Sequence, residues 1–285
     1  MLAPIVEALR GHRSVIAAEL RPPRAELEAA AGRDAWIDTY HAVRGLSRNG
    51  TYVFLTDSAV GTPEEDNLRH LVANLGTDVP RDRVVPFLTC KHPLGYCLSY
   101  AGRAGQHGFP ALVVLGGDRR VGGPRCVAHA WELRRQIRER EPSLALGGWA
   151  NPHADPESQV RYLTAPDFSA DFYLTQIVSH HHRREVARFL SAAEHARVTL
   201  PGVFGVFYYR SANPATLDAL GQFLPVPREA LAEEFGAGAT PQEVCARTLR
   251  VLLDAGARHF YISNLPLARA SRVLGEILEL VRVPA

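Results

Sequence analysis

The chain has 285 residues and 46% of them are hydrophobic, so it is long enough for one large domain or two modest ones with an ample core. Its 32 basic residues nearly balance its 30 acidic residues, which gives no reason to expect a nucleic acid or an anionic membrane as a partner. No signal peptide opens the chain, and no apolar stretch approaches the roughly 18 residues that a membrane helix needs. The four cysteines form no CxxC pair and no zinc-type spacing. We therefore expect a cytoplasmic protein with reduced cysteines, either a monomer or a small homo-oligomer.

Strand-like and helix-like segments alternate along the chain. The candidate strands are short, unbroken apolar runs, which are typical of a parallel sheet covered on both faces. They are Val15–Leu20, Thr51–Thr56, Val84–Thr89, Ala111–Leu115, Leu144–Trp149, Asp171–Gln176, Thr199–Val206 and Arg258–Ser263. The candidate helices are Ala35–Arg48, Pro63–Leu75, Leu94–Gln106, Pro124–Arg140, Pro156–Tyr162, His182–His195, Pro214–Phe223, Arg228–Phe235, Pro241–Ala255 and Leu267–Val281.

This alternation predicts the fold class. Five of the helices start on a proline, where its missing N–H costs nothing, and Gly256 stands where a helix C-cap favours glycine. Eight strand–helix units without a linker-like stretch predict an α/β protein, a (β/α)8 barrel forming a single domain over residues 1–285. A doubly wound open sheet is the alternative, but no GxGxxG or P-loop motif follows any strand.

Two of the predicted strands end on carboxylates, at the barrel edge where active sites lie. Glu19 is followed by Leu20-Arg21-Pro22-Pro23, whose prolines stiffen the loop, and burial would raise its pKa and suit it to general acid catalysis. A salt bridge to Arg21 is the alternative. Asp118 follows Gly116-Gly117, where it could equally initiate a helix. Together the two carboxylates predict an acid/base site, and hence an enzyme.

Two further polar motifs leave alternatives open. Gln176, at the end of a strand, suits the orientation of a polar heterocycle, or it ties two strands together. His180-His181-His182 raises the question of a metal, but adjacent histidines at a helix start rarely converge on one ion and no third-ligand motif supports them. We expect no metal site. With Arg183 and Arg184 these histidines more plausibly form a basic rim.

Several short motifs, in the same order and at the same spacing along the chain, resemble those of methylenetetrahydrofolate reductases. The resembling segments are Glu19-Leu20-Arg21-Pro22-Pro23, Leu55-Thr56 with Ala59, Phe87-Leu88-Thr89-Cys90, Leu115-Gly116-Gly117-Asp118, Trp149 to His153, Leu174-Thr175-Gln176, Pro201-Gly202 and His259-Phe260-Tyr261 with Asn264. Several independent motifs in one order are more specific than any one of them. That family has a (β/α)8 barrel fold and reduces 5,10-methylenetetrahydrofolate to 5-methyltetrahydrofolate.

The resemblance implies roles for these residues. Glu19 would protonate N10 as the methylene bridge opens, and Asp118 would stabilise the resulting iminium cation. The implied substrate-binding residues are Gln176, Thr89, Asn264 and Tyr261. The implied cofactor-binding residues are Thr56, Ala59, Gly117, Trp149 and His153.

The departures from the family pattern concern its usual flavin, FAD. The family's arginine before Gly-Asp is Gly116 here, its histidine before Leu-Thr-Cys is Phe87, its basic helix pair is Thr164 and Ala165, and the arginine after its last Leu-Asn is absent. Each lost cation removes charge-assisted hydrogen bonds to a pyrophosphate. In this respect the chain resembles the flavin-free members from high-GC bacteria, which implies direct hydride transfer from NADH or NADPH and no FAD. An FAD-dependent reductase and a non-catalytic folate-binding subunit are the alternatives.

Overall fold

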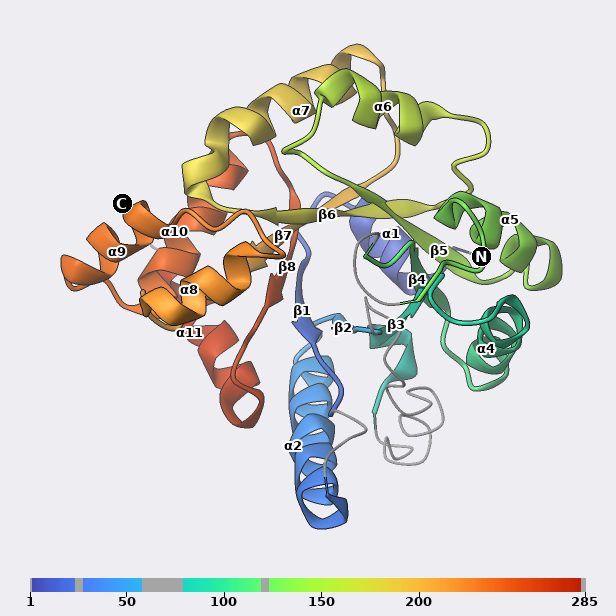
Figure 1. Ribbon diagram of the computed structural model, residues 1–285, viewed down its shortest axis with the longest axis horizontal. Coiled ribbons are helices and arrows are strands. Elements are labelled where there is room, and N and C mark those ends of the chain that lie inside the picture. Colours follow the sequence, from blue (N-terminus) through green and yellow to red (C-terminus); the bar gives the residue numbers. More distant parts are fainter. Residues whose placement is uncertain (1, 24–27, 58–78, 119–122, 283–285) are drawn as a thin grey trace.

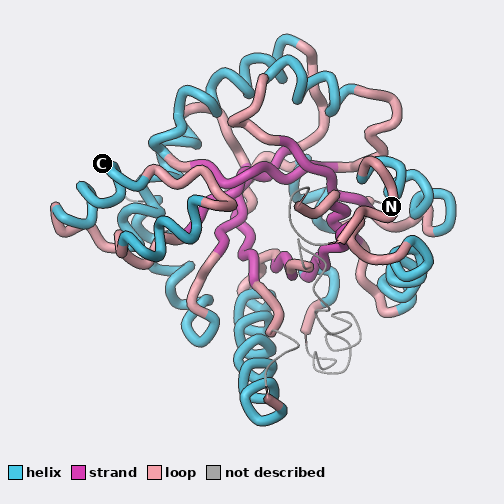
Figure 2. The backbone as a smooth tube through the Cα atoms, viewed as in Figure 1, coloured by secondary structure: helices cyan, strands magenta, loops and turns pink. Residues whose placement is uncertain are grey.

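Eight parallel strands lie next to one another in chain order and close into a barrel (Figures 1 and 2). The computed structural model describes residues 2–23, 28–57, 79–118 and 123–282. The strands are β1 (Ile16–Leu20), β2 (Val53–Leu55), β3 (Val84–Thr89), β4 (Ala111–Leu115), β5 (Ala145–Ala150), β6 (Phe172–Val178), β7 (Gly202–Phe207) and β8 (His259–Ser263). Pairing of β1 with β8 completes the ring. The predicted single-domain (β/α)8 barrel is confirmed, and each predicted strand corresponds to an observed one.

Alternation along each strand divides the core into two parts. Ala17, Phe54, Phe87 and Tyr261 belong to a cluster that fills the barrel, which we call the interior cluster. Their immediate neighbours, such as Ala18, Leu55, Leu88 and Ile262, belong to a second cluster that packs under the surrounding helices. Successive strand residues face opposite sides, so an unbroken apolar run serves both layers.

The helices surround the barrel, as the tube trace shows (Figure 2). Those that follow the first strand are α2 (Ala29–Arg48), α4 (Leu94–Gln106), α5 (Ala130–Arg140), α6 (Pro156–Thr164), α7 (Arg183–His195), α8 (Pro214–Gly221), α9 (Arg228–Gly236), α10 (Pro241–Asp254) and α11 (Ala270–Arg282). Short 3-10 turns are η1 (Arg81–Arg83), η2 (His180–His182) and η3 (Leu267–Arg269). Pro156, Pro214 and Pro241 occupy the first turns of their helices, and Gly256 takes a left-handed φ of 100° after α10.

Several features of the helices differ from the prediction, and α2 begins six residues before its predicted start at Ala35. The helix expected at Pro124–Arg140 begins only at Ala130, where the backbone N–H of His129 donates to the Glu132 carboxylate. Pro124 therefore lies in the preceding loop. A further helix, α1 (Pro4–Arg10), was not predicted, because its seven residues are too few for a clear period. The predicted helix Pro63–Leu75 lies outside the described residues.

Helix α1 closes the N-terminal end of the barrel. Its buried Ile5, Val6 and Leu9 belong to the interior cluster. The Arg258 guanidinium, just before β8, donates to the Gly11 and His12 carbonyls at the end of this helix. The opposite end, where the strands finish, is thereby the end available to a ligand. In the described part of the chain, no helix is both long and apolar enough to cross a membrane.

Candidate active site at the barrel mouth

Polar side chains follow the interior cluster at the C-terminal ends of the strands. Glu19 comes two residues after Ala17, and Thr89 comes two residues after Phe87. Because alternate strand residues face the same side, these two polar side chains line the barrel mouth above the apolar filling. The sequence analysis therefore placed Glu19 and Thr89 at the right end of the barrel.

Glu19 lies at this mouth beside the last strand. Ser263 Oγ donates a hydrogen bond to Glu19 Oε1 over 2.7 Å. Burial raises the pKa of the Glu19 carboxyl from 4.5 to about 7, and the hydrogen bond from Ser263 partly opposes this rise. Arg21, the partner considered from the sequence, is exposed beyond the end of β1, and the causes that set this pKa are burial and Ser263. A carboxyl group with this pKa is protonated in a large fraction of molecules near neutral pH and can donate a proton.

A second carboxylate, Asp57, was missed by the sequence analysis. It follows β2, and its Oδ2 accepts hydrogen bonds from the Thr89 backbone N–H at 2.7 Å and from Thr89 Oγ1 at 3.0 Å. His92 Nε2 lies 2.8 Å from the same oxygen and 3.0 Å from Oδ1. The Asp57 side chain is only 5% exposed. The sequence contained a signal for Asp57, because this residue, like Glu19 and Asp118, is a carboxylate at the end of an apolar strand.

Asp118 lies on the loop after β4, two strands further round the barrel from Asp57. With Lys91 and Arg125 it lines a hollow between the loops that follow β3 and β4. Gly117 has a left-handed φ of 72°, and its carbonyl accepts a hydrogen bond from the Arg125 guanidinium. Asp118 is thus set beside two cations at the rim, whereas Glu19 lies at the end of a strand.

Arg125 also changes the interpretation of Gly116. A Cβ atom at Gly116 would lie 2.6 Å from Arg125 Cζ, so the absent side chain makes room for this guanidinium. The sequence analysis counted Gly116 as a lost cation. The structure instead brings a cation to this strand end from the following loop.

Thr164 and Ala165, which stand where the family has its basic helix pair, carry no positive charge. Thr164 Oγ1 donates to the Val160 carbonyl within α6, and Ala165 ends that helix. Neither residue can neutralise a pyrophosphate. The donor set at the end of α6 therefore does not fit the phosphate site that the resemblance to flavin-containing reductases implies.

Gln176 lies at an irregularity in β6, where the register with β7 shifts between Leu174 and Ile177. Its Oε1 accepts from the Ile177 backbone N–H at 2.8 Å, so the side chain folds back on its own strand. The strand-to-strand bond is made by Thr175 instead, whose Oγ1 accepts from the Gly205 N–H of β7. The hydrogen bond between strands that the sequence analysis considered for Gln176 is therefore made by its neighbour Thr175.

The residues predicted to hold the dinucleotide lie on several strand ends. Trp149 on β5 is partly buried and packs against the interior cluster. His153 Nε2 donates to the Ile177 carbonyl at 2.8 Å, which places it beside the end of β6. The Thr56 N–H donates to the Leu20 carbonyl at the end of β1. Ala59 lies outside the described residues.

Tyr261 is not placed to contact a substrate, so that prediction is corrected here. The side chain is 1% exposed, and its hydroxyl donates to the Thr175 carbonyl at 2.6 Å inside the barrel. Gly205 makes this crossing feasible, since a Cβ there would lie 2.4 Å from the Tyr261 hydroxyl. Asn264, at a left-handed φ of 69°, donates from Nδ2 to the Tyr208 carbonyl and so joins the loops after β7 and β8.

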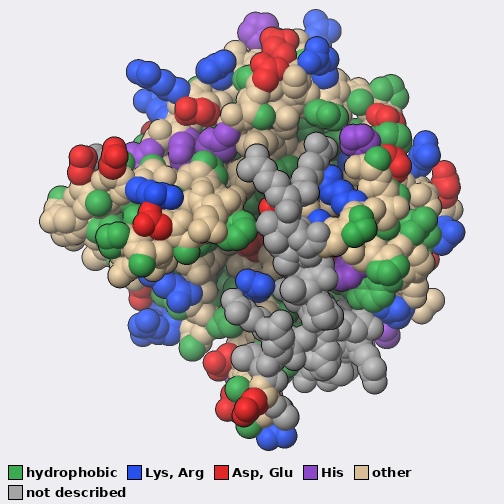
Figure 3. Space-filling view, viewed as in Figure 1, with side chains coloured by type: hydrophobic (Ala, Val, Ile, Leu, Met, Phe, Trp, Pro, Cys, Tyr) green, Lys and Arg blue, Asp and Glu red, His purple; other side chains and the backbone are tan. Residues whose placement is uncertain are grey.

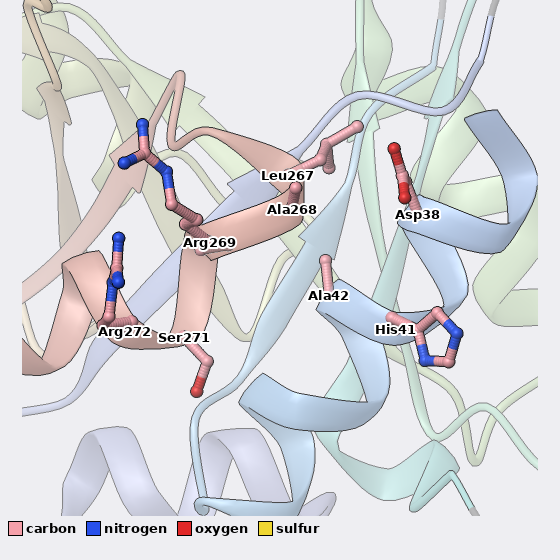
Figure 4. A pocket seen from close by; sticks show the side chains of 9 residues that line it. Asp38, His41, Ala42, Leu267, Ala268, Arg269, Ser271 and Arg272 are labelled. Atoms are coloured by element: carbon pink, nitrogen blue, oxygen red, sulfur yellow. The ribbon is translucent and has the colours of Figure 1, made fainter. Parts of the chain in front are cut away.

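A separate hollow lies outside the barrel, between α2 and the residues around the start of α11. Asp38, His41, Arg269 and Arg272 are among the residues that line it (Figure 4). It contains none of the residues at the strand ends. We do not include it in the candidate site.

Comparisons with known proteins find chains of similar fold but no matching family model or curated sequence. No family model matches the chain, and no curated protein matches it. Among solved structures, an uncharacterized protein from Clostridium thermocellum that binds two copies of 5-methyl-5,6,7,8-tetrahydrofolic acid is similar, with a TM-score of 0.68 and 15% identity over 99% of this chain and 98% of that one. Dihydrodipicolinate synthase from Oceanobacillus iheyensis is similar with a TM-score of 0.52 and 13% identity, over 96% of this chain and 75% of that one. At these identities the likeness establishes the barrel fold alone.

Proposed function

We propose that this chain reduces 5,10-methylenetetrahydrofolate to 5-methyltetrahydrofolate, taking a hydride directly from NADH or NADPH. The observation that carries the proposal is Glu19, a carboxyl group with a pKa of about 7 held at the barrel mouth by Ser263. The ordered motifs shared with methylenetetrahydrofolate reductases support the reaction. The folate ligand named for the Clostridium thermocellum protein supports the substrate class.

The proposed chemistry divides into two steps. Protonated Glu19 donates its proton to N10 as the bond between N10 and the bridging methylene breaks, which leaves an iminium cation at N5. A hydride then adds to the methylene carbon from the nicotinamide, giving the N5-methyl group and the oxidised dinucleotide. The dinucleotide and the pterin share the mouth, with the reacting carbons about 3–3.5 Å apart.

Negative charge near the mouth would favour the cation between these steps. Asp118, on the loop after β4, is the residue to which the resemblance assigns this role. Asp57 is a further carboxylate at the end of β2, adjacent to the strand that carries Glu19, and its orientation is fixed by Thr89 and His92. Electrostatic stabilisation of this kind acts only on the way to product, so it lowers the barrier more than it tightens substrate binding.

The absence of cations at Thr164 and Ala165 favours the flavin-free reading over an FAD-dependent reductase. Arg125 near the end of β4 argues for the FAD-dependent reductase, because it supplies one cation near the expected phosphate position. A folate-binding subunit without catalysis is the second candidate. The neighbour described only as a binder of a methylated folate is what favours it.

One set of measurements separates these candidates. The full-length protein, purified without added flavin, is expected to be colourless and to oxidise NADH or NADPH only when 5,10-methylenetetrahydrofolate is present. Initial rates with both substrates varied should give intersecting reciprocal plots, because both substrates are bound at once. Parallel plots or stoichiometric FAD released on denaturation would identify the flavoenzyme. Tight 5-methyltetrahydrofolate binding with no dinucleotide oxidation would identify the binding subunit.

A further inference from the structure

Two of the three consecutive histidines, just after the C-terminal end of β6, converge on one carboxylate. His180 and His181, in the η2 turn after β6, direct their Nε2 atoms to Glu234 Oε1, at 2.7 and 2.6 Å. Glu234 is on α9, and the three ligand atoms lie within 4.8 Å of one another. The sequence analysis expected adjacent histidines not to converge. Among the described residues, this is the one group of three or more such side chains able to hold a metal ion.

The group is partly shielded from solvent, and His181 is its most exposed member. The side chains of His180 and Glu234 are 11% and 12% exposed, and that of His181 is 23% exposed. Figure 3 shows histidine side chains gathered on this face of the molecule. A carboxylate and two imidazoles at this depth are costly to desolvate unless a proton or a cation lies between them.

The hydrogen bonds around His180 show where a cation would bind. Thr248 Oγ1, on α10, donates to the Val244 carbonyl at 3.1 Å and lies 2.8 Å from His180 Nδ1. Thr248 holds Nδ1, so Nε2 of the same ring is the atom directed at Glu234 Oε1. The 2.7 Å contact between Nε2 and Oε1 is a hydrogen bond, whose proton a bound metal ion would displace.

We propose that His180, His181 and Glu234 bind one Zn²⁺ ion. Two imidazoles and one carboxylate form a common zinc ligand set, and nitrogen donors select zinc or cobalt over magnesium or calcium. Ligand atoms about 2.0–2.1 Å from a tetrahedral ion lie roughly 3.3 Å apart, so each histidine nitrogen needs to move away from Glu234 Oε1 by less than ~1 Å. The fourth position takes a water molecule.

The surrounding residues match the second shell of a zinc site. Thr248 fixes the ring orientation of His180, as ligating histidines require. The Arg247 guanidinium binds Glu234 Oε2 and leaves Oε1 toward the histidines. The ion would thus join the turn after β6 to α9, a helix of the segment between β7 and α10, and stabilise that segment. This role is independent of the proposed folate reaction.

The test uses the full-length protein without a histidine tag, stripped of metal with a chelator. Competition with a chromophoric chelator should give one equivalent of bound Zn²⁺, and Co²⁺ should give the visible absorption of a tetrahedral complex. Glu234→Gln and His181→Ala should each weaken Zn²⁺ binding by ~100-fold or more, and Thr248→Val by about 10–100-fold. His195→Ala removes one exposed histidine on α7 and should leave the affinity unchanged.

Two results would contradict the proposed zinc site. If stripped wild-type protein binds no equivalent of Zn²⁺, or if Glu234→Gln binds it as tightly as wild type, the site does not exist. If a variant does not fold, the melting temperatures of folded wild type and of His195→Ala are measured with and without Zn²⁺ instead. Zn²⁺ should then raise the melting temperature of wild type and of His195→Ala alike. Absence of that rise in wild type overturns the proposal.

Discussion

Ser263 Oγ lies 2.7 Å from Glu19 Oε1, so the last strand of the barrel holds the carboxyl group of the first. The bond fixes one oxygen of Glu19 toward β8. It also works against the rise in pKa that burial causes. The same contact therefore orients the Glu19 carboxyl group and moderates the pKa that burial raises.

Glu19→Gln should reduce turnover by about 10²–10⁴-fold, because the amide fills the same space but cannot donate an acidic proton. Folding and substrate affinity should be retained. Steady-state kinetics with 5,10-methylenetetrahydrofolate measure the effect. Glu279→Gln, at an exposed position on α11, is the matched control. Turnover near that of wild type in Glu19→Gln would remove this carboxyl from the mechanism.

The pH profile should carry the signature of Glu19. The acid must be protonated, so kcat/KM should be level below pH of about 7 and fall as the pH rises through the Glu19 pKa. Ser263→Ala removes the hydrogen bond that lowers this pKa, so its falling limb should move to higher pH. Ser99→Ala, on the exposed side of α4, should keep the wild-type profile. A limb that stays in place in Ser263→Ala would assign it to another group.

Stability should respond to the same ionisation. The pKa of Glu19 lies at about 7 in the folded protein against an ordinary value of 4.5, so the folded state holds more protons than the unfolded state between these values. The contribution of Glu19 to the free energy of unfolding is therefore full below pH 4.5 and is lost as the pH rises through about 7. In Glu19→Gln this part of the pH dependence of urea denaturation should disappear.

Asp118→Asn should lower kcat by about 100-fold and change KM little, because the cation that it stabilises forms only after substrate binding. Comparison of kcat with KM for the folate is the measurement. Asp38→Asn, at an exposed position on α2, provides the control. An increase in KM alone would make Asp118 a binding contact.

Asp57 and His92 should be energetically coupled. Loss of the Asp57 acceptor leaves the Thr89 N–H without this partner and should cost about 1–3 kcal/mol of stability. In a double-mutant cycle of Asp57→Ala and His92→Ala, followed by denaturation, the coupling should be about 0.5–3 kcal/mol. Additive effects of the two substitutions would show that the contact contributes nothing as a pair.

Tyr261→Phe tests the corrected role of this residue. The change removes the hydrogen bond to the buried Thr175 carbonyl, so the free energy of unfolding should fall by about 1–3 kcal/mol while KM stays unchanged. Tyr162→Phe, whose ring is 54% exposed on α6, should alter neither quantity. A large change in KM with stability preserved would restore Tyr261 to the substrate site.

The strands were predictable because a barrel strand needs apolar residues on both faces. Val84–Thr89 and Leu94–Gln106 were predicted with their observed bounds. The start of α5 was not, because a proline is compatible with a first helical turn but does not require one. Helix α1 depends on tertiary packing, since its three buried residues are stabilised by the barrel they close.

The site was predictable only where a residue's position on its own strand decided the outcome. Glu19 is such a residue, because it faces the same side as the buried Ala17 and lies near the C-terminal end of its strand. The contact of Asp57 with His92 joins residues 35 positions apart, and that of His180 with Glu234 joins residues 54 positions apart. Both depend on how loops and helices meet in space, which no local pattern contains. Tyr261 was misassigned because a motif match does not reveal how deeply a ring is buried.

The contact between Glu19 and Ser263 also has a consequence for biosynthesis. The two residues are 244 positions apart, so a nascent chain carries Glu19 long before the strand that positions it has left the ribosome. Until β8 pairs with β1, the sheet is open and Glu19 remains hydrated, with the acidity of an ordinary carboxyl group. Contacts so distant in sequence also form late in folding. The proposed general acid is thus among the first parts of the protein to be synthesised and among the last to reach its final environment.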